Sequence, residues 1–228
     1  MKLKAVSATQ FPSSPMRILS AVVLLIGMAS GALAQGTVIL QNGTGLVFQW
    51  TRATDPTLIS VPKNGGFIEL IAAPTGTALP NPLGSYTASG FNPNYPTLSG
   101  FLAANPGWQV GTSIGGPAFP IALGNGLFSS GTVTINNIAE GANAEYVIIG
   151  WTGAFTTYDA AFANGTGMVG QSAIATTATG DPLATPVPGF PVSLRYTFAG
   201  FPQAIIPEPT SFALAGLGLA ALLVFRRR

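Results

Sequence analysis

The sequence contains no cysteine and no histidine among its 228 residues. Without cysteine it can have no disulfide framework, no thiolate nucleophile and no zinc ribbon. Without histidine it can have no serine–histidine–aspartate triad and no imidazole metal ligand. Charged residues are also scarce, at 7% of the chain, where a soluble domain averages about 25%. These absences exclude several common catalytic chemistries, and we expect neither an enzyme nor a bound cofactor or metal.

The few charges are distributed unevenly along the chain. Six of the nine basic residues lie within the first 17 or the last three positions. Between residues 35 and 206, three basic and six acidic residues leave a net charge of −3. A nucleic-acid-binding protein needs clustered lysine and arginine to neutralise phosphates. The sequence therefore excludes nucleic acid as a partner.

The N-terminus has the pattern of a secretory signal peptide. Basic residues precede the apolar run 18–28, and small residues follow it up to Ala32-Leu33-Ala34. A basic start, a short apolar core and an A-x-A site are the three parts of such a signal, and the core is too short for an uncleaved anchor. We expect residues 1–34 to be removed by signal peptidase, with Ala32 and Ala34 at the cleavage site.

The C-terminus combines three features. These are the motif Pro207-Glu208-Pro209, an uncharged apolar stretch over residues 212–225, and the final Arg226, Arg227 and Arg228. A helix over the stretch is about 21 Å long, shorter than the ~30 Å hydrocarbon core. It is nevertheless apolar on all sides, and the arginines can reach the headgroups. Basic residues after the span predict a transmembrane helix with a cytoplasmic C-terminus.

Together these features resemble the PEP-CTERM sorting signal of exopolysaccharide-forming Gram-negative bacteria. Ile206 and Thr210 replace the valine and serine that are frequent in that family. The resemblance implies that a membrane enzyme, exosortase, recognises Pro207-Glu208-Pro209 and processes the tail. It further implies that the protein is anchored in the inner membrane before processing and then resides in the envelope, at the surface or in the extracellular matrix. The alternative is a plain C-terminal anchor.

The middle of the chain has the pattern of short β-strands. Asn42-Gly43 separates the β-rich runs 37–41 and 46–51, which is a strong hairpin signal. Residues 192–198 alternate, with valine, leucine, tyrosine and phenylalanine on one face. Further strands are expected over residues 67–72, 108–114, 132–138, 146–152 and 172–177.

Short strands punctuated by turn residues predict a mainly β fold, a single β-sandwich or jelly-roll-like domain. A short helix is expected over residues 159–163, with Thr157 or Asp159 as its cap. The predicted organisation is a signal peptide over 1–34, a β-rich extracytoplasmic domain over 35–203 and the sorting signal over 204–228.

Residues 78–107 are rich in proline, glycine, asparagine and serine, and we expect a long surface excursion. Aromatic residues are spaced through and just after it: Tyr86, Phe91, Tyr95, Phe101 and Trp108. Aromatic faces on loops can stack on sugar rings. The alternative is that they hold the loop against the sheet.

Few residues are candidates for chemistry. Glu140 and Glu145 could form a glycosidase carboxylate pair, with Asp159 in a similar role. The favoured interpretation is that the two glutamates are solvated turn carboxylates and that Asp159 is a helix cap. Asp55 and Asp181 lie in turns without calcium-loop spacing. Asn42 and Asn164 begin sequons that are usually only turns in bacteria.

Three hypotheses follow from the sequence. The first is a non-enzymatic structural or matrix-associated surface protein. The second is a carbohydrate-binding module that holds extracellular polysaccharide. The third is an enzyme with carboxylate chemistry.

Overall fold

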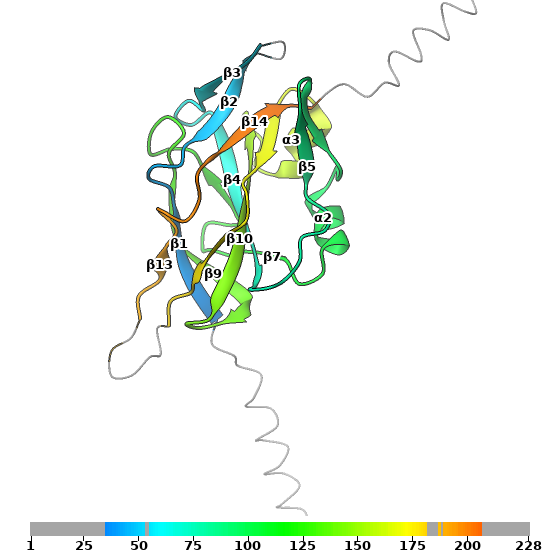
Figure 1. Cartoon of the computed structure of the whole chain (residues 1–228). Helices are drawn as coiled ribbons and strands as arrows, with labels where there is room; N and C mark the ends of the chain where they lie inside the picture. The colour runs from blue at the N-terminus through cyan, green and yellow to red at the C-terminus, as the bar shows by residue number, and fades with distance from the viewer. Residues whose placement is uncertain (1–34, 53–54, 182–186, 188, 207–228) are drawn as a thin grey trace, which may run out of the picture. The chain divides into compact units, whose positions relative to one another are not determined.

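The computed structural model describes residues 35–52, 55–181, 187 and 189–206. Most of them form β-strands (Figure 1). The elements are β1 (Gln35–Gln41), β2 (Val47–Arg52), β3 (Asp55–Ser60), β4 (Gly66–Pro74), β5 (Gly84–Thr87), β6 (Gly90–Pro93), α2 (Leu98–Ala104), β7 (Gln109–Val110), β8 (Ala118–Pro120), β9 (Ser129–Ala139), β10 (Asn143–Thr152), α3 (Tyr158–Asn164), β11 (Met168–Gln171), β12 (Ala175–Ala178), β13 (Val192–Ser193) and β14 (Phe201–Ile205). The prediction of a mainly β fold is confirmed.

The largest sheet has the order β3-β2-β14-β11-β10-β4-β7, with β12 on β10 and β8 on β4. Its centre is the antiparallel pair of β4 and β10, in register from Ala144 opposite Pro74 to Thr152 opposite Gly66. Both strands are almost continuously apolar and buried, as expected for strands covered on both faces. We call this sheet the central sheet.

One face of the central sheet packs on a three-stranded sheet with the order β13-β1-β9. Alternate residues of β4 and β10, such as Leu70 and Ile148, meet Val38 of β1 and Val133 of β9. We call this the sheet-to-sheet core. It also includes Leu40, Ile68, Ala72, Ile135, Tyr146, Leu194 and Phe201.

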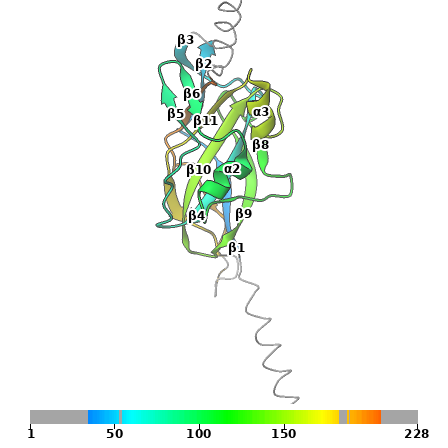
Figure 2. The same cartoon turned by 90° about the vertical axis from the view of Figure 1, so that its right-hand side faces the viewer.

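The opposite face is covered by α2, α3 and the β5–β6 hairpin (Figure 2). The next residues along the same strands, such as Ile71 and Ile149, face this side. We call this the helix-side core. Its large side chains are Trp50, Phe91, Phe101, Trp108, Trp151 and Tyr158, so all three tryptophans of the chain belong to it.

Each helix begins at a threonine. The Thr97 hydroxyl accepts from the Gly100 N–H at the start of α2, and the Thr157 hydroxyl accepts from the Ala160 N–H at the start of α3. Such caps satisfy N–H groups that lack partners within the helix. The predicted short helix with Thr157 as its cap is therefore confirmed, and α2 was not predicted.

The predicted hairpin around Asn42-Gly43 is wrong. β1 and β2 belong to different sheets and do not pair. The buried Asn42 side chain donates to the carbonyls of Gly45 and Gly126 and accepts from the Phe128 N–H, over 2.7–2.8 Å. These bonds give hydrogen-bond partners to backbone carbonyl and N–H groups where the chain passes from one sheet to the other. The asparagine thus stabilises a crossing between sheets.

Two other predictions need correction. Only Val192–Ser193 of the expected strand over 192–198 is a strand, because a turn from Leu194 to Thr197 interrupts it and leaves Tyr196 exposed. Residues 78–107 are not a simple surface excursion, since they contain a hairpin and a helix and contribute to the helix-side core. Buried rings anchor this segment despite its turn-rich composition.

Candidate functional site

The loop over residues 111–117 divides two cavities beside the central sheet. It leaves β7, which pairs with Ile71 and Ala72 of β4, and returns as β8, which pairs with β4 from Phe67 to Glu69. Thr112 forms an antiparallel bridge with Thr134 of β9, through backbone bonds of 2.8 and 2.9 Å. The loop therefore connects the central sheet to the three-stranded sheet.

The 111–117 loop is held in shape by bonds within itself. The Ser113 hydroxyl donates to the Gly116 carbonyl at 2.8 Å, and the Gly116 N–H donates to the Ser113 carbonyl at 3.1 Å. Gly116 has a φ of 98°, a conformation that favours glycine. The tight turn leaves the preceding Ile114 fully exposed at its tip.

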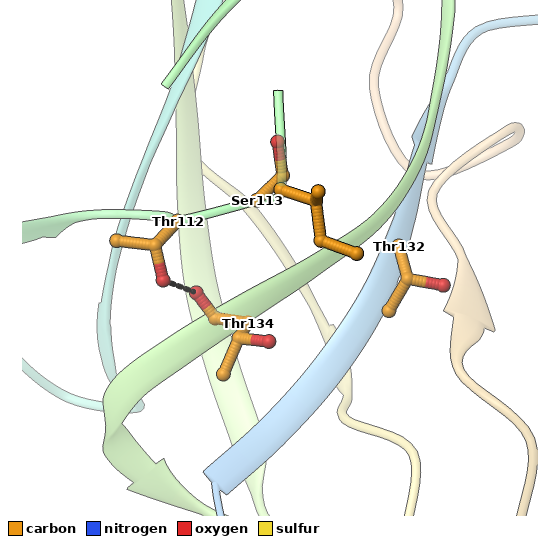
Figure 3. A pocket seen from close by; sticks show the side chains of 5 residues that line it. Thr112, Ser113, Thr132 and Thr134 are labelled. Atoms are coloured by element: carbon orange, nitrogen blue, oxygen red, sulfur yellow. Dashed lines mark hydrogen bonds between the residues drawn. The ribbon is translucent and has the colours of Figure 1, made fainter. Parts of the chain in front are cut away.

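The first cavity has a volume of about 350 Å³ and is lined mainly by threonine (Figure 3). Thr132 and Thr134 point away from the sheet-to-sheet core because Val133 and Ile135 point into it. The Thr112 hydroxyl lies 3.4 Å from the Thr134 carbonyl oxygen, a weak bond. We call this cavity the threonine groove. Its hydroxyls can each donate and accept a hydrogen bond.

The second cavity, of about 440 Å³, is lined by residues of the same loop and by Glu69 of β4. Glu69 is only 4% exposed. Burial raises the pKa of its carboxyl to about 7, and the negative charge of Asp159 contributes to this rise. The remaining lining residues are Val110, Thr112, Ser113, Gly116 and Pro117. We call this the Glu69 cavity.

Glu69 is a candidate site residue that is not among those predicted from the sequence. The signal was an ionisable residue inside the strand Phe67-Ile68-Glu69-Leu70-Ile71, which has no alternation of apolar and polar residues. A strand without alternation is buried on both faces, so any acid within it is buried too. A buried carboxyl with a raised pKa is a common feature of functional sites.

The carboxylates singled out in the sequence have separate structural partners. Glu145 accepts a hydrogen bond from the Gly76 N–H at 3.0 Å. Burial, and then the neighbouring Asp181, raises the pKa of Glu140. Asp159 accepts from the Leu98 N–H at 2.7 Å and so connects α3 to the first turn of α2. The structure thus gives Glu140 and Glu145 different partners, and it brings Asp159 close enough to Glu69 for their charges to interact.

The two turn aspartates differ in their surroundings. The Asp55 carboxylate accepts from the Thr57 N–H at 3.0 Å, and the bonds from Thr57 lower its pKa. Asp181 lies beside Glu140, whose pKa it raises. Within the described ranges, no three acidic, histidine or cysteine residues gather in a way that could hold a metal ion.

The aromatic residues from Tyr86 to Trp108 pack against the domain. Phe91, Phe101 and Trp108 are buried in the helix-side core. Tyr95 packs edge-on against Phe101. Tyr86 is 42% exposed, and its hydroxyl donates to the Pro202 carbonyl and accepts from the Gln171 N–H, at 2.5 and 3.1 Å. The series therefore holds the segment against the sheet and does not present a row of faces for sugar stacking.

The two sequons also have structural surroundings. Asn42 is buried by the sheet crossing described above, so its amide is not accessible. Asn164 is the last residue of α3, and its side chain accepts from the Thr166 hydroxyl. Gly165, which follows, ends the helix with a φ of 71°, as glycines commonly do.

The predicted terminal signals lie outside the described residues. This applies to the cleavage site at Ala32 and Ala34, to Pro207-Glu208-Pro209, and to the apolar stretch 212–225 with the arginines after it. In the part of the chain that the structure does describe, both helices have seven residues. Neither is long and apolar enough to cross a membrane.

The geometry defines a β-rich domain whose polar side chains mostly hold loops and helices in place. Residues 206–228 match the family model of the PEP-CTERM protein-sorting motif. This motif implies an exported protein that is processed by exosortase, a membrane enzyme. No curated protein and no solved structure matches the chain.

Proposed function

We propose that the protein is a structural component of the cell envelope or extracellular matrix, exported through residues 1–34 and released or transferred by exosortase. The observation that carries this proposal is the match of residues 206–228 to the sorting motif. In this proposal Pro207-Glu208-Pro209 is the recognised segment. Proline restricts its own φ and disfavours helix in the residue before it, so we assign recognition by the enzyme to this proline-flanked carboxylate.

The chemistry of the β domain supports a structural role. Two of the carboxylates that the sequence singled out accept backbone hydrogen bonds, Glu145 from Gly76 and Asp159 from Leu98. Large rings are buried in the helix-side core. The packing of the three-stranded sheet on the central sheet supports a sandwich-type architecture. Only 7% of the residues are charged, and a surface with few charges repels copies of itself weakly, which suits assembly in a matrix.

The test follows an epitope-tagged full-length chain by fractionation and blotting in a host that contains exosortase. Wild-type protein should lose its membrane association and decrease in size. Glu208→Ala should accumulate as an unprocessed membrane-bound form, because it removes the carboxylate and keeps the apolar stretch and the arginines. Glu145→Gln, which removes a carboxylate from the β domain and leaves the tail unchanged, is the control and should be processed normally.

Equal membrane retention of wild type and Glu208→Ala, with no size change in either, would contradict processing and leave a plain anchor. Deleting Arg226, Arg227 and Arg228 should give a different defect. Without these cations the orientation and retention of the short apolar stretch should weaken. The deleted form should therefore be found outside the membrane fraction, at the size of the unprocessed protein.

A further inference from the structure

Glu69 has an unusual position for a carboxyl group. Its backbone lies inside the central sheet, opposite Ile149 of β10 and Ala118 of β8. Its side chain is on the helix side of β4, together with Phe67 and Ile71. At 4% exposure it lines the Glu69 cavity, and no residue that the structure describes forms a hydrogen bond with it. A polar group buried in this way is costly unless something pairs with it.

The charges around Glu69 are of one sign. Asp159 is the charged neighbour that acts on it, and this acid raises the pKa of Glu69 in addition to the effect of burial. The basic residues between positions 35 and 206 are Arg52, Lys63 and Arg195, and none of them lines the cavity. The Glu69 cavity therefore has a negative potential that no cation of its lining compensates. Such a site favours a ligand that brings a positive charge.

The rest of the lining defines the other properties of the ligand. Val110 and Pro117 offer an apolar wall, while Thr112 and Ser113 border both the Glu69 cavity and the threonine groove. Volumes of about 440 and 350 Å³ lie within the range of small-molecule sites, roughly 300–1,000 Å³. A fitting ligand combines an ammonium group, several hydroxyls and an apolar face. An amino sugar with a free amine has all three.

We propose that the Glu69 cavity and the threonine groove together bind an amino sugar, whose ammonium group pairs with Glu69 and whose hydroxyls bond to the threonines. The ammonium donates hydrogen bonds to the carboxylate oxygens. The hydroxyl of Thr112 lies at the boundary of the two cavities and contacts the ring that spans them. This site goes beyond the sorting function and is independent of exosortase processing.

Isothermal titration of the full-length chain in detergent at pH 7.5 tests the proposal. D-glucosamine should bind, and Glu69→Gln should weaken binding about ten-fold or more, since hydrogen bonds to charged groups are the strong ones. N-acetyl-D-glucosamine, which lacks the charge, and cyclohexylamine, which lacks the hydroxyls, should each bind at least about ten-fold more weakly. Thr112→Val should weaken glucosamine binding by a smaller factor. Glu145→Gln is the matched control for net charge and should bind as wild type.

Each alternative result overturns the proposal. Equal binding of the N-acetylated sugar would show a neutral-sugar site, and equal binding of cyclohexylamine would show an amine site without sugar recognition. No heat of binding with millimolar glucosamine would show that the cavity has no such ligand. If Glu69→Gln fails to fold, as judged by its tryptophan emission, Thr112→Val replaces it as the deciding variant, and unchanged affinity in that variant overturns the proposal. None of these results depends on whether exosortase processes the C-terminal tail.

Discussion

The two faces of the central sheet are stabilised in different ways. On the helix side, the polar atoms of Trp108, Trp151 and Tyr158 have backbone partners. Trp108 donates to the Ala78 carbonyl at 3.1 Å and Trp151 to the Phe155 carbonyl at 2.7 Å. In the sheet-to-sheet core, the Tyr146 hydroxyl and both side-chain polar atoms of Gln203 have no partner among the described residues. These rings of the helix side thus have directional bonds that the side chains of Tyr146 and Gln203 on the other side lack.

Removing the largest buried ring is the strongest way to test this difference. Trp151→Ala should lower the free energy of unfolding by about 3–5 kcal/mol, because Trp151 is fully buried and supports Tyr158 edge-on. Its loss should also shift the native emission of Trp50 and Trp108 to longer wavelength. Urea unfolding of the full-length chain, followed by tryptophan fluorescence, measures both effects.

The matched variant is Ile148→Ala, on the opposite face of the same strand. Ile148 belongs to the sheet-to-sheet core, and its truncation should cost about 2–4 kcal/mol. Because all three tryptophans are on the helix side, the native emission should remain that of the wild type. An equal spectral change in both variants would show that the two cores are not separate layers.

The pH dependence of the free energy of unfolding should come from the helix side of the central sheet, through Glu69. The folded-state pKa of about 7 is above the ordinary 4.5, so the folded protein binds the proton more tightly than the unfolded chain. Its contribution to stability is complete below pH 4.5 and is lost as the pH rises through 7. A difference of about 2.5 between these two pKa values, at about 1.4 kcal/mol per pKa unit, makes the loss at most about 3.5 kcal/mol.

Urea unfolding at pH 5 and pH 8 measures this loss. Glu69→Gln should remove most of the difference between the two pH values, because an amide does not titrate. Glu145→Gln should retain it. A wild-type difference that persists in Glu69→Gln would assign the pH dependence to other acids.

The smallest expected effect compares two buried amides. Gln203→Leu should raise the free energy of unfolding by about 1 kcal/mol, since it replaces an unbonded amide with an apolar side chain. Asn105 is equally buried, but it donates to the carbonyls of Asn81 and Phe101 and accepts from the Asn81 N–H. Asn105→Leu should therefore lower the free energy of unfolding, by about 2 kcal/mol. Equal signs in urea unfolding would refute the distinction.

Local pattern predicted the strands that are strongly apolar and long. The run around Phe67-Ile68 and the alternation around Val133 appear as β4 and β9, because burial in these strands follows directly from residue type. Pairing was harder to predict. Asn42-Gly43 has the chemistry of a tight turn, yet distant bonds to Gly126 and Phe128 determine its role.

The candidate site could be predicted only in part. Thr157 caps a helix that begins at the next residue, so the local sequence was enough to predict its role. The Glu69 cavity depends on a loop more than 40 residues away in sequence. Likewise, Tyr86 bonds to Gln171 and Pro202, contacts that no local pattern encodes. Contacts between residues that are distant in sequence therefore account for most of the site geometry that the sequence did not predict.

The position of β14 has a consequence for the order of events during export. In the central sheet, β14 lies between β2 and β11, parallel to the first and antiparallel to the second. Its residues, Phe201–Ile205, directly precede the sorting motif at 206–228. The two parts of the sheet can join only after this last strand has emerged on the far side of the membrane. Folding of the domain and presentation of the tail to its processing enzyme are thereby coupled in time, and a chain stalled before residue 205 would leave the sheet divided.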